Sequence, residues 1–230
     1  EVLSSSLTQY SDYMKSAKKS SSKDGAAMVT RVGKKIAAAT EQYLRNNGLE
    51  SEIKNFAWEF NLVNDPQVNA FCMPGGKIVV YEGLMQLVSS DDELAVVVGH
   101  EVAHAVAKHS NERMSQQLMA QYGAQILGQA LSNKSAAVQK IGASVYGLGA
   151  QYGVMLPFSR KHESEADYMG LVFMAMAGYN PAVAVNFWQK MSAGKSGSTP
   201  EFMSTHPSDA TRINEIKQHL PEIEKYRVKK

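Results

Sequence analysis

The chain has 230 residues, enough for one domain with a sizeable hydrophobic core. Hydrophobic residues make up 44% and charged residues 20%, which excludes a fully disordered protein. Its 24 basic and 22 acidic residues are nearly balanced and form no basic stripe, so we expect no nucleic-acid partner. A single cysteine, Cys72, excludes an internal disulfide, and no apolar run is long enough to span a bilayer.

Residues 1–23 are rich in serine and lysine and have little hydrophobic periodicity. We predict a leader or tether here, helical in part, followed by a single domain over residues 24–230. The sequence begins at Glu1 rather than at a methionine. A membrane tether through a removed amino-terminal segment is therefore part of this prediction.

Three strands are predicted after a first amphipathic helix. From Asp24 to Leu44 hydrophobic residues recur every three or four positions, which predicts a helix that ends at Gly48. Between Phe56 and Val63 the period changes to two, as is typical of a half-buried strand. Residues 68–72 and 78–81 flank the turn signal Pro74-Gly75-Gly76, so we expect a small antiparallel sheet.

The chain after Gly83 is predicted to be helical. Ser90-Asp91-Asp92-Glu93 is a capping box at the start of a long apolar run. Further helices are expected at about 112–131, 136–153, 157–177 and 181–192, with a short one at 209–216. Residues 194–200 are a flexible connector by composition, and the glycines of 132–157 favour a lid. The predicted fold class is α+β, mostly helical with a small sheet beside the helix that Ser90 begins.

The sequence His100-Glu101-Val102-Ala103-His104 lies inside that helix. Positions four apart on a helix share a face, so the two imidazoles can bind one metal ion, while Glu101 lies about 100° around the axis from His100. Neutral imidazole nitrogen suits zinc, and a catalytic zinc site uses three protein ligands. The motif therefore predicts two ligands of one zinc ion per chain, with Glu101 as a general base.

The third ligand has to come from elsewhere in the chain. Glu163 and Asp167 are four residues apart and share a helical face, whereas Glu165 points away from both. Zinc-bound histidines usually donate their second ring N–H to a carboxylate. The simplest hypothesis makes Glu163 the ligand and Asp167 the partner of a histidine. The other candidate ligands are Glu165, His109, His162 and His206.

Four separated motifs resemble one known protease family. They are the strand-turn-strand residues Asn69-Ala70-Phe71 to Gly83-Leu84, the His100–His104 motif, Ser159-Arg160-x-x-Glu163-x-x-Ala166-Asp167, and Ser204-Thr205-His206-Pro207-Ser208 followed by Arg212. Together these resemble the zincin-like gluzincin metalloendopeptidases of the CAAX prenyl protease, HtpX, LoiP and BepA type. The chain lacks the hydrophobic spans of the integral-membrane branch, so the soluble, envelope-facing branch is the nearer comparison.

The resemblance assigns roles to further residues. It implies that Glu163 is the third zinc ligand, that His206 helps to stabilise the oxyanion, and that Arg212 holds the ligands in place. It also implies that residues 78–81 form an edge strand that pairs with a peptide substrate. The substrate-binding candidates are Asn69, Ala70, Phe71, Ile78, Val79 and Val80. His109 is expected to face away from the site, and His162 to be a surface residue, with a regulatory role as the alternative.

The predicted function is zinc-dependent endopeptidase cleavage of a polypeptide substrate, in unfolded or damaged envelope proteins. One alternative is an aminopeptidase, and the other is a non-catalytic, chaperone-like module with structural zinc. The predicted location is the bacterial cell envelope, either periplasmic or as a membrane-anchored lipoprotein, with the cytoplasm as the alternative. The sequence carries no signal for the oligomeric state.

Overall fold

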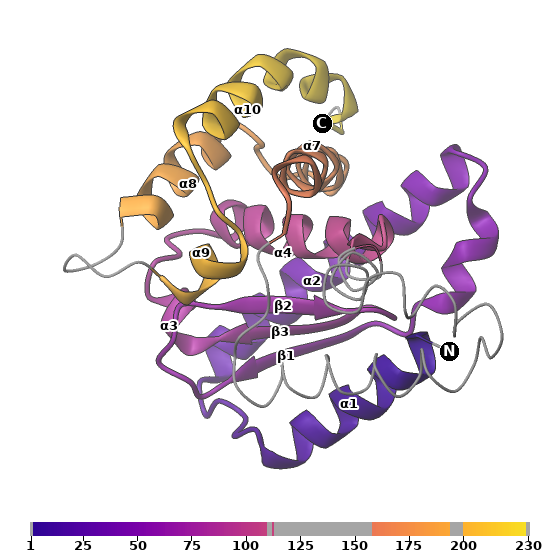
Figure 1. The fold of residues 1–230 in the computed structure, drawn as a ribbon, viewed down its shortest axis with the longest axis vertical. Helices are drawn as coiled ribbons and strands as arrows, with labels where there is room; N and C mark the ends of the chain where they lie inside the picture. The colour runs from indigo at the N-terminus through magenta and orange to yellow at the C-terminus, as the bar shows by residue number, and fades with distance from the viewer. Residues whose placement is uncertain (1, 110–111, 113–157, 194–199, 229–230) are drawn as a thin grey trace, which may run out of the picture.

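The computed structural model describes residues 2–109, 112, 158–193 and 200–228. Helices dominate this part of the chain and surround one three-stranded sheet (Figure 1), which confirms the α+β class. The predicted helices at 112–131 and 136–153, the lid at 132–157 and most of the connector at 194–200 lie outside the described residues.

The sheet contains β1 (Glu59–Val63), β2 (Ala70–Met73) and β3 (Lys77–Tyr81) in the order β1-β3-β2. β2 and β3 form the expected antiparallel hairpin, but β1 runs parallel to β3. The prediction of an antiparallel sheet is therefore wrong for this pair. The hairpin places its second strand beside β1, and side-chain alternation does not encode that choice.

β3 is the central strand, so the prediction that residues 78–81 form an edge strand is wrong. Its backbone is paired with β1 on one side and β2 on the other. The outer side of β1 is also occupied: Ser20 N–H donates to the Leu62 carbonyl at 2.9 Å, and Asn64 N–H to that of Lys18 at 2.7 Å. Within the described chain, the outer side of β2 is the edge without a partner strand.

The two faces of the sheet pack against different helices. Ile78 and Val80 point into the main core with α2 (Lys23–Asn46) and α4 (Asp91–Val106). Val79 points the opposite way, towards Tyr10 of α1 (Val2–Ser16). The expected helical part of residues 1–23 is α1, whose Tyr10 hydroxyl donates to Glu59 at 2.6 Å. The division into a leader and one domain remains a prediction.

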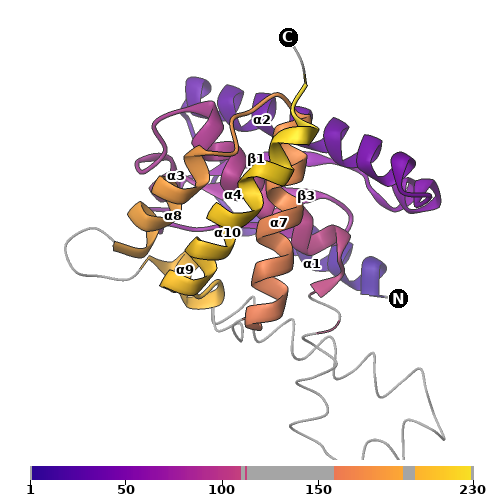
Figure 2. The ribbon, with the colours of Figure 1, turned by 90° about the horizontal axis from the view of Figure 1, so that it is seen from above.

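Helix boundaries follow their capping residues. Ser22 accepts a hydrogen bond from Gly25 N–H and begins α2, and Ser90 accepts one from Glu93 N–H and begins α4. The later helices are α7 (Arg160–Met176), α8 (Val183–Ala193), α9 (Glu201–Thr205) and α10 (Ala210–Ile223), and Figure 2 shows α10 beside α7 and α8. Shorter elements are Glu50–Asn55, Glu82–Met85 and Glu224–Tyr226.

The last helix is longer than expected. The sequence predicts that this helix ends at residue 216, before Pro221. In the structure α10 continues to Ile223, with Pro221 inside it. Proline removes one backbone donor near the end of the helix, and Ile216 and Ile223 are both buried on either side of it. The apolar face therefore extends the helix past the residue that was expected to end it.

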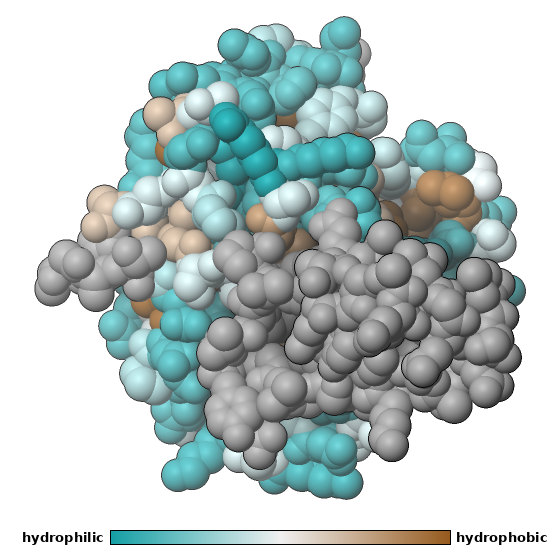
Figure 3. All heavy atoms as spheres, viewed as in Figure 1, coloured by the Kyte–Doolittle hydropathy of each residue, from teal (hydrophilic) through white to brown (hydrophobic). Residues whose placement is uncertain are grey.

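Surface hydrophobic residues are scattered. Among the described residues the exposed large hydrophobic side chains are Leu7, Leu49, Tyr226 and Val228. On the face seen in Figure 3 the described residues are mainly hydrophilic. No helix in the described ranges is long and apolar enough to cross a membrane.

α4 and α7 cross at two glycines in the centre of the molecule. A Cβ atom on Gly170 would lie 2.8 Å from the backbone nitrogen of His100, and one on Gly99 would lie 2.7 Å from the carbonyl oxygen of Gly170. These are contacts with backbone atoms, which cannot rotate away. Only glycine at both positions lets the two helices approach this closely.

We therefore predict that Gly170→Ala separates α4 from α7. The free energy of unfolding should fall by about 1–3 kcal/mol, as for other overpacked cores. The candidate ligands His100 and Glu163 lie on these two helices, so the variant should also weaken binding of the expected zinc ion. Urea unfolding and zinc titration measure these effects, and Lys161→Ala, an exposed change on α7, is the matched control. Unchanged stability in Gly170→Ala would contradict the close approach.

Candidate metal centre

α4 presents the first part of the site. Its core-facing residues, Leu94, Val97, Val98 and Val102, are almost fully buried and fix the rotation of the helix. His100 and His104 then lie one turn apart, with their Nε2 atoms 3.1 Å from each other. Both side chains are buried, and so is Glu101 between them. The helix and its face are as the sequence predicts.

α7 brings Glu163 to the two histidines. Ser159 begins this helix by accepting a hydrogen bond from His162 N–H, so Glu163 lies in the first turn. Its Oε2 atom is 3.1 Å from His100 Nε2, and its Oε1 atom is 2.8 Å from His104 Nε2. Glu163 is 0% exposed. A buried carboxylate with its oxygens among imidazole nitrogens is the arrangement of a metal site.

His206 joins the same donors from a distant segment. It follows α9, and its Nδ1 atom is 2.8 Å from Glu163 Oε1 and 3.3 Å from His100 Nε2. Among the described residues, His100, His104, Glu163 and His206 each offer one ligand atom within 4.8 Å of the others. Three nitrogens and one carboxylate oxygen suit zinc, so the residues present fit that ion.

Asp167 and Arg212 support these donors. Asp167 Oδ1 lies 3.0 Å from His100 Nδ1, the ring nitrogen on the far side from the cluster. Arg212, from α10, donates to both oxygens of Asp167 at 2.5 and 2.9 Å and lies 3.0 Å from Glu163 Oε2. It also donates to the carbonyl of Pro207 at 2.6 Å, next to His206. One guanidinium thus joins α10, α7 and the segment of His206.

Without a metal ion, burial and neighbouring charges shift the pKa values of the clustered side chains in opposite directions. Burial lowers the pKa of His100, but the carboxylates of Glu163 and Asp167 outweigh it and raise the pKa to about 9. At His104 burial dominates and holds the pKa well below its usual value. Burial raises the pKa of Glu163, but the charges of His206 and His100 bring it well below normal. A divalent cation therefore displaces a proton from this site, and its affinity rises with pH.

Glu101 lies beside the donors without belonging to them. Its Oε1 atom is 2.9 Å from His206 Nε2, and its Oε2 atom accepts a hydrogen bond from Cys72 N–H at 3.3 Å. Cys72 is on β2, so the outer edge of this strand faces the catalytic candidate. Ala70 and Phe71 are on the same strand, and Asn69 precedes it.

Two histidines lie elsewhere than predicted. His109 was expected to face away from the site, and His162 to lie on the surface, but both are buried, at 1% and 2% exposure. Their rings stack 4.4 Å apart, and His109 Nδ1 is 2.9 Å from His104 Nδ1. The prediction for His109 continued the helical rotation past Val106, where α4 ends. Neither histidine belongs to the four donors.

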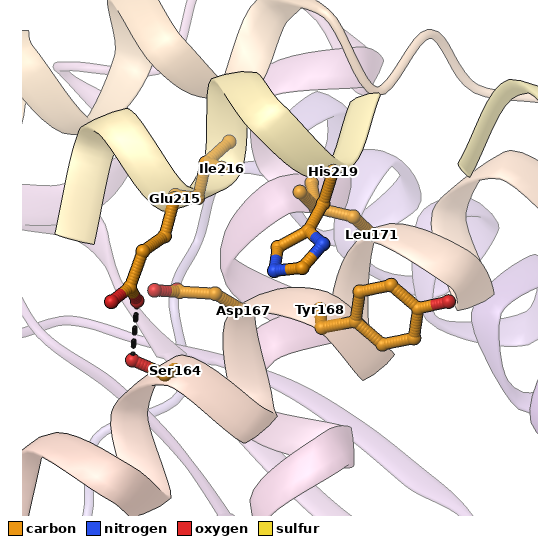
Figure 4. A pocket seen from close by; sticks show the side chains of 7 residues that line it. All are labelled: Ser164, Asp167, Tyr168, Leu171, Glu215, Ile216 and His219. Atoms are coloured by element: carbon orange, nitrogen blue, oxygen red, sulfur yellow. Dashed lines mark hydrogen bonds between the residues drawn. The ribbon is translucent and has the colours of Figure 1, made fainter. Parts of the chain in front are cut away.

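A small pocket lies between α7 and α10 (Figure 4). Ser164 donates to Glu215 at 2.8 Å across it, and the ring of His219 packs edge-on against Tyr168. Asp167 also lines this pocket, and its carboxylate oxygens contact Arg212 and His100. None of the four metal donors lines the pocket, so it is separate from the candidate metal centre.

Comparison with known proteins gives consistent results. The model of peptidase family M48 matches residues 30–220. The chain is 36% identical over 205 residues to the mitochondrial metalloendopeptidase OMA1 of Schizosaccharomyces pombe, a match that covers 85% of this chain and 53% of that protein. It is 40% identical over 168 residues to OMA1 of Arabidopsis thaliana, covering 73% and 33%.

A bacterial protein is also similar. The beta-barrel assembly-enhancing protease of Yersinia pestis is 33% identical over 174 residues, which cover 70% of this chain and 36% of that protein. The chain thus matches about half, or less, of the length of these relatives.

Proposed function

Because the chain belongs to peptidase family M48, we propose that it is a zinc-dependent endopeptidase that cleaves unfolded or damaged proteins. One observation carries this proposal: His100, His104 and Glu163 bring their donor atoms together, with the carboxylate of Glu101 beside them. A site that only held a structural ion would not need a buried carboxylate outside its ligand set.

The proposed catalytic roles belong to the residues around the donors. His100, His104 and Glu163 would hold the zinc ion, which would supply Lewis-acid polarisation and lower the pKa of water towards neutral. Glu101 accepts the proton of the attacking water and delivers it to the leaving amine. Asp167 keeps the ring of His100 oriented, and Arg212 keeps Asp167 in place.

We propose that the substrate adds to the outer edge of β2, which has no partner strand among the described residues. The Tyr81 N–H donates to the carbonyl of Asn69, so antiparallel alternation directs the backbone groups of Asn69 and Phe71 towards β3 and those of Ala70 and Cys72 outwards. The contact from Cys72 N–H to Glu101 agrees with this direction. A peptide paired here would lie along the catalytic carboxylate and gain affinity through its main chain.

Two roles can be proposed for His206, oxyanion stabiliser or fourth metal donor, and its position favours the second. As an oxyanion stabiliser it would donate from Nε2, but that atom is 2.9 Å from Glu101. As a fourth donor through Nδ1 it would take the position that a catalytic zinc site keeps for water. In the second role, His206 has to leave the cluster before hydrolysis and also frees Glu101. The donor geometry favours this closed resting arrangement.

The substitution His206→Ala separates the two roles. With zinc in excess, we expect the variant to cleave an unfolded protein faster than the parent, because the fourth position and Glu101 are released. Zinc should also dissociate more readily, since one donor is lost. Initial rates at several zinc concentrations measure both effects. A loss of about 10²–10³ in rate would instead support the oxyanion role.

The function itself is tested by removing and restoring the metal. The parent should digest an unfolded protein, lose the activity to a chelator and regain it with zinc. Cleavage should continue when the amino terminus of a peptide substrate is blocked. A requirement for a free amino terminus would favour an aminopeptidase, and tight zinc binding without any cleavage would favour the non-catalytic module.

The proposal for the cellular location rests on the similar proteins. OMA1 is named as a mitochondrial metalloendopeptidase, and the Yersinia pestis protein as a beta-barrel assembly-enhancing protease. For this chain we propose the bacterial cell envelope, with a tether through the amino-terminal segment. Fractionation of cells that produce the full precursor, followed by detection of the protease in each fraction, tests this location.

A further inference from the structure

We propose that His109 is a positioning residue for the metal centre: it accepts a hydrogen bond from Nδ1–H of His104, and the carboxylate of Glu165 lies beside its other ring nitrogen. The pair His109–Glu165 would do for His104 what Asp167 does for His100. This inference rests on the proposed function in one respect, because it takes His104 as a zinc ligand.

The proton positions follow from the contacts of His104. Its Nε2 atom faces the donor cluster, 2.8 Å from Glu163 Oε1. A neutral imidazole that binds a metal through Nε2 carries its hydrogen on Nδ1. That nitrogen is 2.9 Å from His109 Nδ1, which must then be the acceptor. The hydrogen of a neutral His109 lies on Nε2, which is 3.3 Å from Glu165 Oε2, close enough for an ion pair but without hydrogen-bond geometry.

The backbone is bent to bring His109 back to the site. α4 ends at Val106, and Lys108 adopts a φ of 58°, in the left-handed region that residues other than glycine rarely enter. This turn reverses the direction expected from continued helical rotation and places His109 against His104. A strained conformation of about 1 kcal/mol or more persists only where the surrounding contacts stabilise it.

The ring of His109 is held on its other side as well. It stacks on His162 with centroids 4.4 Å apart and planes 18° apart, and His162 Nε2 is 3.0 Å from Glu112 Oε2. His109 is 1% exposed, whereas Glu165 is 46% exposed at its side chain. The buried imidazole therefore extends from the ligand to a carboxylate at the surface.

α7 carries the candidate ligand Glu163 and also the two carboxylates, Asp167 and Glu165, that lie beside histidine rings. Glu163 faces the donors, Asp167 lies one turn later beside His100, and Glu165 projects from another side of the helix towards His109. Each zinc-binding histidine of α4 thus has its own partner, a carboxylate for His100 and an imidazole followed by a carboxylate for His104. Loss of such partners typically weakens metal affinity 10- to 100-fold.

The experiment compares two substitutions of His109 in the full chain, with zinc alone as the probe. His109→Phe keeps an aromatic ring against His162 but removes the acceptor, and His109→Asn restores an acceptor near the position of Nδ1. The zinc dissociation constant, measured by competition with a chelator, should rise about 10- to 100-fold in the Phe variant. The Asn variant should recover most of this affinity.

Nuclear magnetic resonance supplies a readout that packing alone would not move. In the zinc-loaded parent, Nδ1–H of His104 should give an exchange-protected ring N–H signal. The signal should disappear or shift in His109→Phe and return in His109→Asn. The control His162→Phe keeps the stack and leaves the acceptor intact, so it should retain the signal. Glu165→Ala should weaken zinc binding less than His109→Phe does.

Parental zinc affinity and an unchanged signal in a folded His109→Phe would overturn the proposal. If that variant does not fold, unchanged values in Glu165→Ala together with no signal from Nδ1–H in the zinc-loaded parent would overturn it as well. Failure of the proposed function is distinguishable: a parent that binds zinc but cleaves no substrate contradicts the function and leaves the zinc measurements as evidence on His109.

Discussion

Substitution of Glu101 with glutamine should abolish peptide cleavage and leave zinc bound. Glutamine keeps the shape of the side chain but cannot accept the proton of the attacking water, and general-base catalysis contributes about 10²–10⁴ in rate. Glu101 is not one of the four clustered donors, so the metal content should stay at the parental value. Cleavage of an unfolded protein and metal analysis of the same sample measure the two properties together.

The matched control is Glu215→Gln, the same chemical change in the pocket between α7 and α10. It removes a charge near Ser164 but touches none of the donors, so cleavage should continue at the parental rate. A Glu101→Gln variant that digests its substrate as fast as the parent would show that Glu101 is not the base.

Substitution of Arg212 with methionine should lower the free energy of unfolding more than Gly170→Ala does. Methionine preserves much of the hydrophobic stem, but the carboxylates of Asp167 and Glu163 lose their buried counter-charge, and the carbonyl of Pro207 loses its donor. Removing one partner of a buried ion pair typically costs about 3–5 kcal/mol. Urea unfolding of the metal-free protein should show a fall of this size in the free energy of unfolding.

Two comparisons sharpen this result. Arg212→Lys keeps the charge without the planar fork that binds both oxygens of Asp167, so its stability should lie between the parent and the methionine variant. Arg160→Met removes an exposed pair with Asp209 at 3.7 Å and should change stability by less than about 1 kcal/mol. If Arg212→Met and Arg160→Met had the same small effect, the buried network would not stabilise the fold.

The parts of the site that can be predicted from sequence are those governed by local geometry. The spacing of His100 and His104 on one helix, and of Glu163 and Asp167 on another, fixes which side chains share a face. The buried apolar residues of α4 then determine which face points inwards. The structure brings these residues together as the sequence predicts.

The wrong predictions concern features that depend on strand pairing between distant residues or on the exact end of a helix. Alternation in residues 78–81 indicates a strand but not its neighbours, so the central place of β3 was missed. The turn at Lys108 was also missed, because the sequence carries no glycine there to mark a left-handed residue. The burial of His109 and His162 follows from that turn and from the packing of α7, which no local pattern encodes.

Arg212 has a consequence for the order in which the donor cluster forms. The ribosome synthesises His100 and His104 long before His206 and Arg212, and the last of these holds the segment that carries the fourth donor. A nascent chain therefore presents only part of the donor set until α10 has been made and has docked. A chain that ends before residue 206 would keep His100, His104 and Glu163 but lack both the fourth donor and the arginine that holds its segment.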